Sequence, residues 1–354
     1  MKKILASVLV LCMMAALLAG CGSKPAPAPA ATEAPKAEEP APAPAATEAP
    51  KAEEPAPAEE PAEAEEEEDE ENYETGDASL DDPLNQDGIG EKELLVVSFG
   101  TSFNDSRRLT IGAIEKAIQE AYPDWSVRRA FTSQIIIDHV AKRDGEVIDN
   151  VTEALDRAVA NNVKVLFVQP THLMDGYEYN ELKDELAKYA DAFEQIIIGK
   201  PLLQRDADFG DLCNALADAT DSYVDGETAI VLMGHGTEAD SNWVYEHMQK
   251  MFDEAGAEDY FVGTVEATPS LEDVLAKVQA GNYKRVVLRP MMIVAGDHAN
   301  NDMAGPDEDS WKSIFEDAGY EVECVLEGLG QLPEVRRIIL DHVFESMTQQ
   351  ETTK

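Results

Sequence analysis

The sequence predicts an α/β protein in which two similar halves, each a parallel sheet covered by helices, face a cleft. Three observations support this fold class. The composition changes abruptly at Glu93, where a polar, proline-rich segment gives way to short apolar runs. These runs alternate with helix-length amphipathic stretches, and continuous apolar runs of this length are typical of strands buried on both faces. Short motifs also recur in the same order in each half, which indicates an internal duplication.

Residues 1–20 have the pattern of a signal peptide. Lys2 and Lys3 form a basic start, and the apolar run that follows is short for a membrane span. The run ends in the letters LAGC, which resemble a bacterial lipobox and imply cleavage before Cys21 and lipid attachment to its sulfur. The alternative is an ordinary signal peptide with an accidental cysteine. We expect an exported lipoprotein of the cell envelope, anchored to the membrane outside the cytoplasm.

Residues 21–92 are expected to form a disordered acidic tether. The letters APAPAATEAPKAEEP occur twice in succession, and an acidic run follows them. Beyond Cys21 the segment's Leu, Ile, Val and Phe residues are limited to Leu80, Leu84 and Ile89. It therefore buries too little apolar surface to offset the entropy lost on ordering. The sequence predicts that a chain starting near Gly90 is as stable as a longer one.

The globular part divides into an N-terminal half at 93–205 and a C-terminal half at 226–348. Apolar runs predict strands at 94–99, 127–131, 163–169, 195–198, 229–233, 260–265, 285–289 and 321–325. Amphipathic stretches predict helices at 106–121, 147–161, 178–190, 208–223, 239–255, 270–280, 309–318 and 333–347. Strands that alternate with helices form βαβ units, so both sheets are expected to be parallel.

The duplication pairs positions of the two halves. The letters SFGT at 98–101 and GHGT at 234–237 each follow the first strand of a half. The stretch 169–176 matches 289–296 at the same internal spacing. In this alignment Phe99 takes the place of His235, and Glu178 takes the place of His298. The N-terminal half therefore lacks these histidines and is expected to form the opposing wall of the cleft.

The composition excludes several classes of function. A formal net charge of −43 repels phosphate backbones, so nucleic acid is not expected as a partner. The four cysteines are too few for a disulfide framework and have no CxxC spacing. The glycine-flanked loops contain neither GxGxxG nor GxxxxGK[ST], so no nucleotide cofactor is expected, and no GxSxG elbow of a serine hydrolase is present.

Three polar residues fall just beyond predicted strands of the C-terminal half. His235 follows one strand between two glycines, Glu266 follows the next, and His298 lies in the loop after a third. The carboxyl ends of parallel strands meet at one edge of a sheet, where ligands bind. Two imidazoles and a carboxylate suit a divalent first-row metal and leave positions open for water or substrate. The sequence therefore predicts a metal site at this edge.

The other histidines have simpler interpretations. His139, His247 and His342 fall on predicted helical faces, where a packing or surface role is expected. His172 follows a strand, so a position in the cleft is open to it, but its counterpart in the duplication is Met292 rather than a ligand.

Six motifs carry a family resemblance: SFGTSFNDSR (98–107), RAFTS (129–133), QPTHLMDGYEY (169–179), LMGHGT (232–237), TVEATPS (264–270) and RPMMIVAGDHANNDMAGP (289–306). In these motifs and their order the chain resembles the anaerobic sirohydrochlorin cobaltochelatases, which are class II chelatases of the same broad fold group as ferrochelatase. The resemblance implies two Rossmann-like, chelatase-type domains with a tetrapyrrole bound between them. It also implies that the chain inserts Co²⁺, with Fe²⁺ and Ni²⁺ as alternatives. The family's metal ligands carry over onto His235, Glu266 and His298, and we expect His235 to accept a proton as well.

The resemblance also places the substrate. Thr101, Ser102 and Glu178, in motifs of the N-terminal half, are expected to contact the tetrapyrrole. Its carboxylates need cations, for which the sequence offers Arg107, Arg128 and Arg129. The alternative function is an exported, non-catalytic lipoprotein that binds a metal or a tetrapyrrole, and the predicted export favours it. The sequence leaves open whether the chain forms a homo-oligomer.

Overall fold

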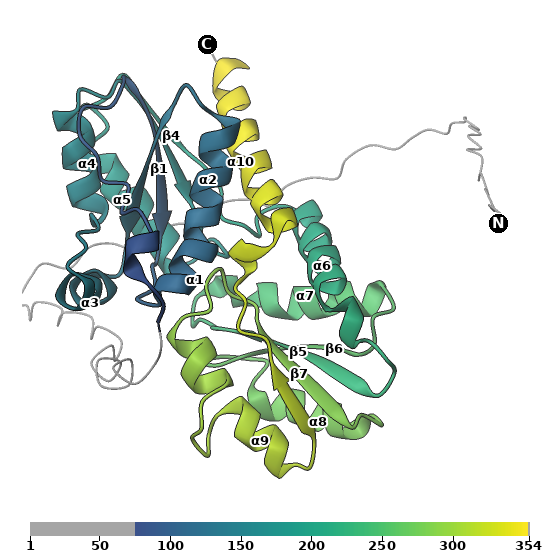
Figure 1. The fold of residues 1–354 in the computed structure, drawn as a ribbon. Coiled ribbons are helices and arrows are strands. Elements are labelled where there is room, and N and C mark those ends of the chain that lie inside the picture. Colours follow the sequence, from purple (N-terminus) through teal and green to yellow (C-terminus); the bar gives the residue numbers. More distant parts are fainter. Residues whose placement is uncertain (1–74, 353–354) are drawn as a thin grey trace, which may run out of the picture. The chain divides into compact units, whose positions relative to one another are not determined.

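A computed structural model describes residues 75–352, which contain two four-stranded parallel sheets with helices packed on them (Figure 1). The strand order is β2-β1-β3-β4 in one sheet and β6-β5-β7-β8 in the other. The predicted α/β fold class is therefore confirmed. The predicted signal peptide, the lipidation site Cys21 and residues 21–74 of the predicted tether lie outside the described residues. We call β1–β4 with α1–α5 the first lobe, and β5–β8 with α6–α9 the second lobe.

The first lobe alternates strands and helices. Its strands are β1 (Lys92–Ser98), β2 (Ser126–Phe131), β3 (Val165–Pro170) and β4 (Gln195–Ile198). Its helices are α1 (Asn104–Leu109), α2 (Ile111–Ala121), α3 (Gln134–Asp144), α4 (Val151–Ala160) and α5 (Tyr177–Lys188). All of β1 beyond its first residue is buried, as its continuous apolar run predicts.

The second lobe repeats this pattern. Its strands are β5 (Thr228–Gly234), β6 (Tyr260–Thr264), β7 (Arg285–Pro290) and β8 (Glu321–Cys324). Its helices are α6 (Asp206–Thr220), α7 (Trp243–Glu254), α8 (Leu271–Ala280) and α9 (Trp311–Asp317), and the C-terminal helix α10 (Pro333–Thr352) follows β8. A short π-helical turn, Ala299–Met303, lies between β7 and α9.

The sheets of the two lobes are built on the same plan. Each has its first strand second in the order, flanked by its second and third strands. The register also agrees, because Val97 of β1 lies opposite Pro170, as Met233 of β5 lies opposite Pro290. The topology thus agrees with the duplication that the motifs indicate.

Two helical regions differ from the sequence prediction. The helix expected at 106–121 is divided at Thr110 into α1 and α2. A helical face was expected around His139, but the bounds of helix α3 were not predicted. It begins where the Ser133 hydroxyl accepts a hydrogen bond from the Ile136 N–H, and it ends at Gly145, which has a positive φ of 72°. Both ends are thus fixed by local capping rather than by a strong amphipathic pattern.

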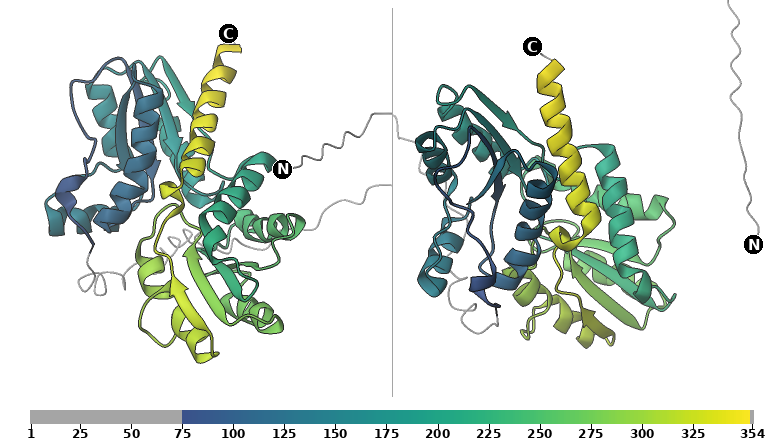
Figure 2. Two further views of the ribbon diagram at one scale, coloured as in Figure 1. Left: turned by 45° about the vertical axis from the view of Figure 1, so that its right-hand side comes forward. Right: turned by 45° about the horizontal axis from the view of Figure 1, so that its top comes forward.

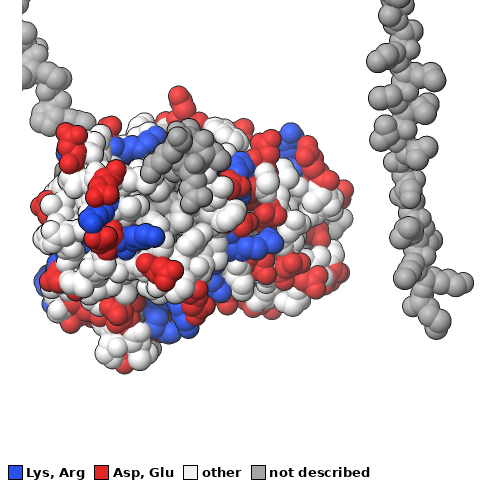
Figure 3. All heavy atoms as spheres, turned by 90° about the horizontal axis from the view of Figure 1, so that it is seen from above, with Lys and Arg blue, Asp and Glu red and all other residues white. Residues whose placement is uncertain are grey.

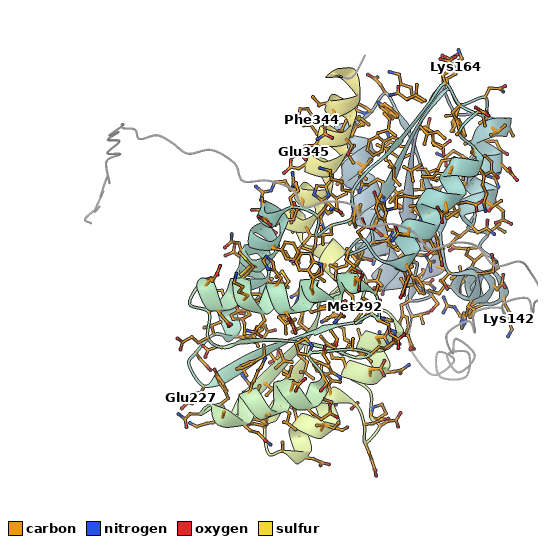
Figure 4. All side chains as sticks on the ribbon, turned by 180° about the vertical axis from the view of Figure 1, so that it is seen from behind. Lys142, Lys164, Glu227, Met292, Phe344 and Glu345 are labelled. Atoms are coloured by element: carbon orange, nitrogen blue, oxygen red, sulfur yellow. The ribbon has the colours of Figure 1, made fainter. Side chains whose placement is uncertain are left out.

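Helix α10 returns from the second lobe to the first. It packs against α6, α2 and β4, and the two views of Figure 2 show it beside α2. One cluster of buried apolar side chains continues from β1 through α2, α10 and α6 to β5. Glu345, labelled on α10 in Figure 4, forms ion pairs with Lys200 at 3.5 Å and with Arg205. The two lobes therefore share a common core instead of being joined by a linker alone.

The segment 75–91 corrects the predicted boundary of the tether. The sequence assigns these residues to a disordered segment, but they run along the first lobe and are bonded to it. The Arg129 N–H of β2 donates to the Leu84 carbonyl at 3.1 Å, and Gln86 Nε2 donates to the Val127 carbonyl at 3.1 Å. The segment is ordered although it has few apolar residues, because main-chain hydrogen bonds and ion pairs hold it on the first lobe.

The surface is acidic without a basic patch on the face seen in Figure 3. Acidic side chains are spread over that face, and basic side chains lie among them singly. Within residues 75–352, no helix combines the length and the apolar character needed to cross a membrane.

Candidate metal centre

The predicted ligands extend from the carboxyl ends of three adjacent strands. His235 directly follows β5, and Glu266 lies two residues beyond β6. His298 follows β7 by a loop and immediately precedes the π-helical turn. Since β5 pairs with both β6 and β7 in parallel, all three loops emerge at one edge of the sheet.

The structure brings the three side chains together. One potential ligand atom from each of His235, Glu266 and His298 lies within 4.8 Å of the others. The two imidazole rings meet edge to face, with centroids 4.6 Å apart and planes at 85°. His235 Nδ1 lies 3.6 Å from Glu266 Oε2. His235 and Glu266 are about half exposed, whereas His298 is more enclosed, so the group is open to solvent on one side.

Hydrogen bonds select the nitrogen that each imidazole presents. His235 Nδ1 lies 2.8 Å from the Gly236 carbonyl, and His298 Nδ1 lies 2.6 Å from Asp302 Oδ2. Both oxygens can only accept, so each Nδ1 carries the proton. Nε2 of both rings is therefore the nitrogen with a free lone pair. A carboxylate or carbonyl behind a ligating histidine is the usual arrangement around protein-bound metals.

Asp302 also affects the charge of His298. Burial of the ring acts to lower the pKa of His298, but the hydrogen bond and the negative charge of Asp302 outweigh it, and the pKa is raised above its ordinary value. Asp302 was not predicted from the sequence. Asp302 lies four residues after His298, at a helical turn, and this spacing places two side chains on one face. That spacing is the feature of the sequence from which Asp302 could have been predicted.

Close backbone packing holds the His235 and Glu266 loops together. The Glu266 N–H donates to the His235 carbonyl at 2.9 Å. Gly236 has a φ of +94°, and a Cβ there would lie 2.8 Å from the Ala267 nitrogen, so only glycine fits this turn. The Gly236 N–H also donates to the hydroxyl of Tyr245 at 3.2 Å, which ties the loop to α7.

The first lobe reaches the His298 loop. The Ala295 N–H donates to the Ser106 hydroxyl at 3.0 Å, across the boundary between the lobes. Thr101 Oγ1 lies 3.0 Å from the position that a Cβ of Gly296 would take. The loop that carries His298 therefore packs directly on the loop that joins β1 to α1. Sequence reasoning did not identify Ser106 as a contact between the lobes.

The three residues expected to contact substrate have different environments. Thr101 and Ser102 are buried, whereas Glu178 is exposed in the first turn of α5. Burial is the main cause that raises the pKa of Tyr245 to about 12, and the negative charges of Glu178 and Glu266 raise it further. Glu178 of the first lobe is thus within electrostatic reach of the phenol that supports the His235 loop. Phe99, the counterpart of His235, is 41% exposed.

The remaining histidines lie apart from the ligand group. His172 is buried with no hydrogen-bond partner on either ring nitrogen, and burial lowers its pKa to about 4. His342 is buried in α10, with Nε2 3.1 Å from Asp208 Oδ2. His247 packs edge-on against Phe209. Packing roles expected for His247 and His342 agree with these contacts.

The expected role of three arginines is wrong. The sequence analysis offered Arg107, Arg128 and Arg129 as cations for substrate carboxylates, but all three are at most 1% exposed. Their ion pairs lie within the described chain: Arg107 with Asp81 and Glu146, Arg128 with Glu93, and Arg129 with Asp81 and Glu115. They neutralise buried acids and are not available to a ligand.

Comparisons with known proteins agree with this architecture. A family model described as Cobalt chelatase (CbiK) matches residues 92–348. The sirohydrochlorin cobaltochelatase of Salmonella typhimurium is 35% identical over 257 residues, which cover 73% of this chain and 97% of that protein. The sirohydrochlorin cobaltochelatase CbiKC of Nitratidesulfovibrio vulgaris is 31% identical over 260 residues, which cover 73% of this chain and 91% of that protein.

Solved structures are similar in fold. SirB from Bacillus subtilis with Fe³⁺ has a TM-score of 0.54 at 14% identity, covering 74% of this chain and 98% of that one. The sirohydrochlorin chelatase SirB from Bacillus subtilis subspecies spizizenii in complex with cobalt has a TM-score of 0.51 at 13% identity, with the same coverage. At these identities the likeness concerns the arrangement of the chain and not its individual side chains.

Proposed function

This chain belongs to the cobalt chelatase (CbiK) family, and on that premise we propose that it inserts Co²⁺ into sirohydrochlorin. The observation that carries the proposal is the approach of ligand atoms from His235, Glu266 and His298 to within 4.8 Å of one another. The non-catalytic binding protein considered from the sequence is not favoured, because two relatives that are 31–35% identical are named as chelatases.

The donor set supports a role in holding the incoming metal. Two imidazole nitrogens and one carboxylate oxygen are suitable ligands for Co²⁺ and for neighbouring first-row ions. Three protein ligands from one lobe leave the other side of the ion open to ring nitrogens. The Glu266 carboxylate offsets part of the charge of the ion, and the hydrogen bonds at Nδ1 of both rings keep each Nε2 directed for coordination.

The protons of the reaction can be assigned to the same residues. Insertion of one Co²⁺ into the macrocycle releases two pyrrolic protons, so the site needs bases beside the metal. When the ion passes to the ring, the Nε2 atoms of His235 and His298 lose their metal and regain free lone pairs. Neutral imidazole accepts a proton near neutral pH, so His235 is the proposed first base and His298 can take the second.

The ring is proposed to lie between the metal ligands and the first lobe. Thr101 and Ser102 are buried, so we assign them to shaping the β1–α1 loop rather than to extensive contact with the ring. Exposed Phe99 offers an aromatic surface at the position that His235 occupies in the second lobe, and Glu178 offers a carboxylate. A site that holds the ring bent toward the metal stabilises the geometry of the transition state more than that of the free ring.

A direct assay tests the proposal. The purified chain is incubated with Co²⁺ and sirohydrochlorin, and the absorbance change of metal insertion is followed, with Fe²⁺ and Ni²⁺ in parallel reactions to identify the preferred metal. His235→Ala should abolish the enzymatic rate because it removes a ligand and the proposed base together. His139→Ala, a change of the same kind on α3, should leave the rate unchanged. A wild-type chain that does not exceed the uncatalysed rate with any of the three metals would contradict the proposal.

We also propose that the protein is an exported lipoprotein held at the membrane through Cys21, which is supported by the LAGC sequence and the basic start of the chain. Cys21→Ser should move the protein from the membrane fraction to the soluble fraction and abolish labelling by a fatty-acid analogue. A wild-type chain that is soluble and unlabelled would show that the lipobox interpretation is wrong.

A further inference from the structure

Residues 75–91, which we call the strap, cover the free edge of the first lobe. Strand β2 is one of the two edge strands of its sheet, and its main chain bonds to the strap through Arg129 and Val127. At the start of the strap, the Thr75 carbonyl accepts from the Asp105 N–H at 2.8 Å. The strap thus protects an exposed edge and reaches the first turn of α1.

Asp81 is the electrostatic centre of the strap. Its Oδ2 lies 2.7 Å from Arg107 Nε and 2.7 Å from Arg129 Nη1, and its side chain is 5% exposed. Burial acts to raise the pKa of Asp81, but the two guanidinium groups outweigh it, and the pKa is lowered. The carboxylate is therefore charged, buried and shared by two buried cations.

Arg107 connects Asp81 to the loop beside the metal centre. Its Nη1 donates to the Thr101 carbonyl at 3.3 Å, and Thr101 Oγ1 in turn accepts from the Phe103 N–H at 3.2 Å. Thr101 also packs on Gly296, two residues before His298. Contacts between buried groups therefore lead from Asp81 through Arg107 to residues 99–106, the β1–α1 loop with the first turn of α1, which contact the loop of His298.

We propose that the strap holds residues 99–106, the β1–α1 loop with the first turn of α1, in their ring-accepting position and that Asp81 is a positioning residue for tetrapyrrole binding. This inference rests on the proposed function. The family match begins at residue 92, so the strap precedes the part of the chain that resembles the family. The strap thus makes the ring-binding side of this protein depend on a segment outside the matched domain, while the metal ligands belong to the second lobe.

The test compares Asp81→Asn in the full chain with Asp82→Asn, the same change at the exposed neighbouring residue. Asp81→Asn should raise KM for sirohydrochlorin roughly tenfold, the equivalent of one lost charge-assisted hydrogen bond, with kcat and Co²⁺ affinity unchanged. Asp82→Asn should leave all three at the wild-type values. An Asp81→Asn chain that unfolds at a lower temperature but keeps the wild-type KM would show that the strap only stabilises the fold, and the proposal would be wrong.

Arg107→Lys is the second variant, for use if Asp81→Asn does not fold. The lysine keeps a positive charge near Asp81 but cannot donate to Asp81 and to the Thr101 carbonyl through a planar fork, so KM should rise while Co²⁺ affinity stays the same. An unchanged KM in this variant counts against the proposal.

Hydrogen exchange separates this inference from the proposed function. The amides of 99–106 should exchange faster in Asp81→Asn than in wild type, whether or not the wild-type chain metallates sirohydrochlorin. Faster exchange in a chain without chelatase activity would leave the strap's structural link intact and refute the proposed function. Unchanged exchange in an active chain would refute the strap's role and leave the proposed function standing.

Discussion

A chain that starts at Gly90 should be markedly less stable than one that starts at residue 75, contrary to the expectation from composition. The shorter chain loses Asp81 and with it three charge-assisted hydrogen bonds, one to Arg107 and two to Arg129. It also loses the Leu84 carbonyl that accepts from the Arg129 N–H. Two guanidinium groups that are at most 1% exposed would be left with one carboxylate fewer.

The cost can be estimated from these contacts. Removing one partner of a buried ion pair destabilises a protein by about 3–5 kcal/mol. The lower end applies here, because Arg107 keeps Glu146, Arg129 keeps Glu115, and truncation admits water to both. For a protein of this size, a loss of about 3 kcal/mol lowers the midpoint of thermal unfolding by about 5 °C.

The assay is thermal and urea unfolding of the two chains, followed by circular dichroism, with Asp81→Asn in the longer chain as a third sample. The point variant should reproduce most of the effect of truncation, because the Asp81 contacts supply most of it. Equal midpoints for the chains starting at residue 75 and at Gly90 would refute this reasoning. They would mean that the strap lies on the lobe without stabilising it, and that the composition correctly identified residues 75–89 as dispensable.

Two further predictions concern the histidines. Asp302→Asn should weaken Co²⁺ binding, measured by calorimetry, by about 10–100-fold, because the neutral amide is a weaker acceptor for the Nδ1 proton of His298 than the carboxylate. Asp307→Asn, on an exposed loop, should leave the affinity unchanged. Equal affinities of the Asp302→Asn chain and the wild type would show that the charge of Asp302 does not orient His298. Burial lowers the pKa of His172 from 6.5 to about 4. As the pH falls, the unfolded chain therefore binds a proton at His172 before the folded chain does. The free energy of unfolding should decrease from pH 6.5 toward pH 4 by up to about 3 kcal/mol. Urea unfolding between pH 7 and pH 4.5 measures this loss of stability. In His172→Phe the free energy of unfolding should depend less on pH over this range. An equal dependence on pH in that variant would show that other groups cause the loss.

The fold could be predicted from the sequence because its strands are buried on both faces. β1 and β5 appear as uninterrupted apolar runs, and such runs are hard to mistake when helix-length stretches alternate with them. The bounds of α3 were not predicted because its amphipathic pattern is weak and three consecutive isoleucines lie in its first turn. They depend on the capping side chain of Ser133 and on Gly145. Local capping of this kind is visible in the sequence only once the helix is suspected.

The site was predictable to the extent that topology determines it. His235, Glu266 and His298 are about 30 residues apart in the sequence, yet the carboxyl ends of adjacent parallel strands have to meet, and this brings them together. Asp302 was not predictable in the same way, because its role depends on a π-helical turn. Asp81 was missed for a different reason: a composition average over residues 21–92 conceals one carboxylate whose partners are buried arginines elsewhere in the chain.

The duplicated lobes differ at the positions where chemistry requires them to differ. The strand order is the same in both, but Phe99 stands where the second lobe has His235, and Glu178 stands where it has His298. A metal enters a macrocycle through one face, so ligands contributed by both lobes would surround the ion and leave no open side for the ring. Ligands from a single lobe would coordinate the ion on one side and leave the other side open to the pyrrole nitrogens. In the proposed function the first lobe is free to bind the ring because it has no histidine at these two positions, and the proposed role of the strap is to stabilise the loop on which this binding depends.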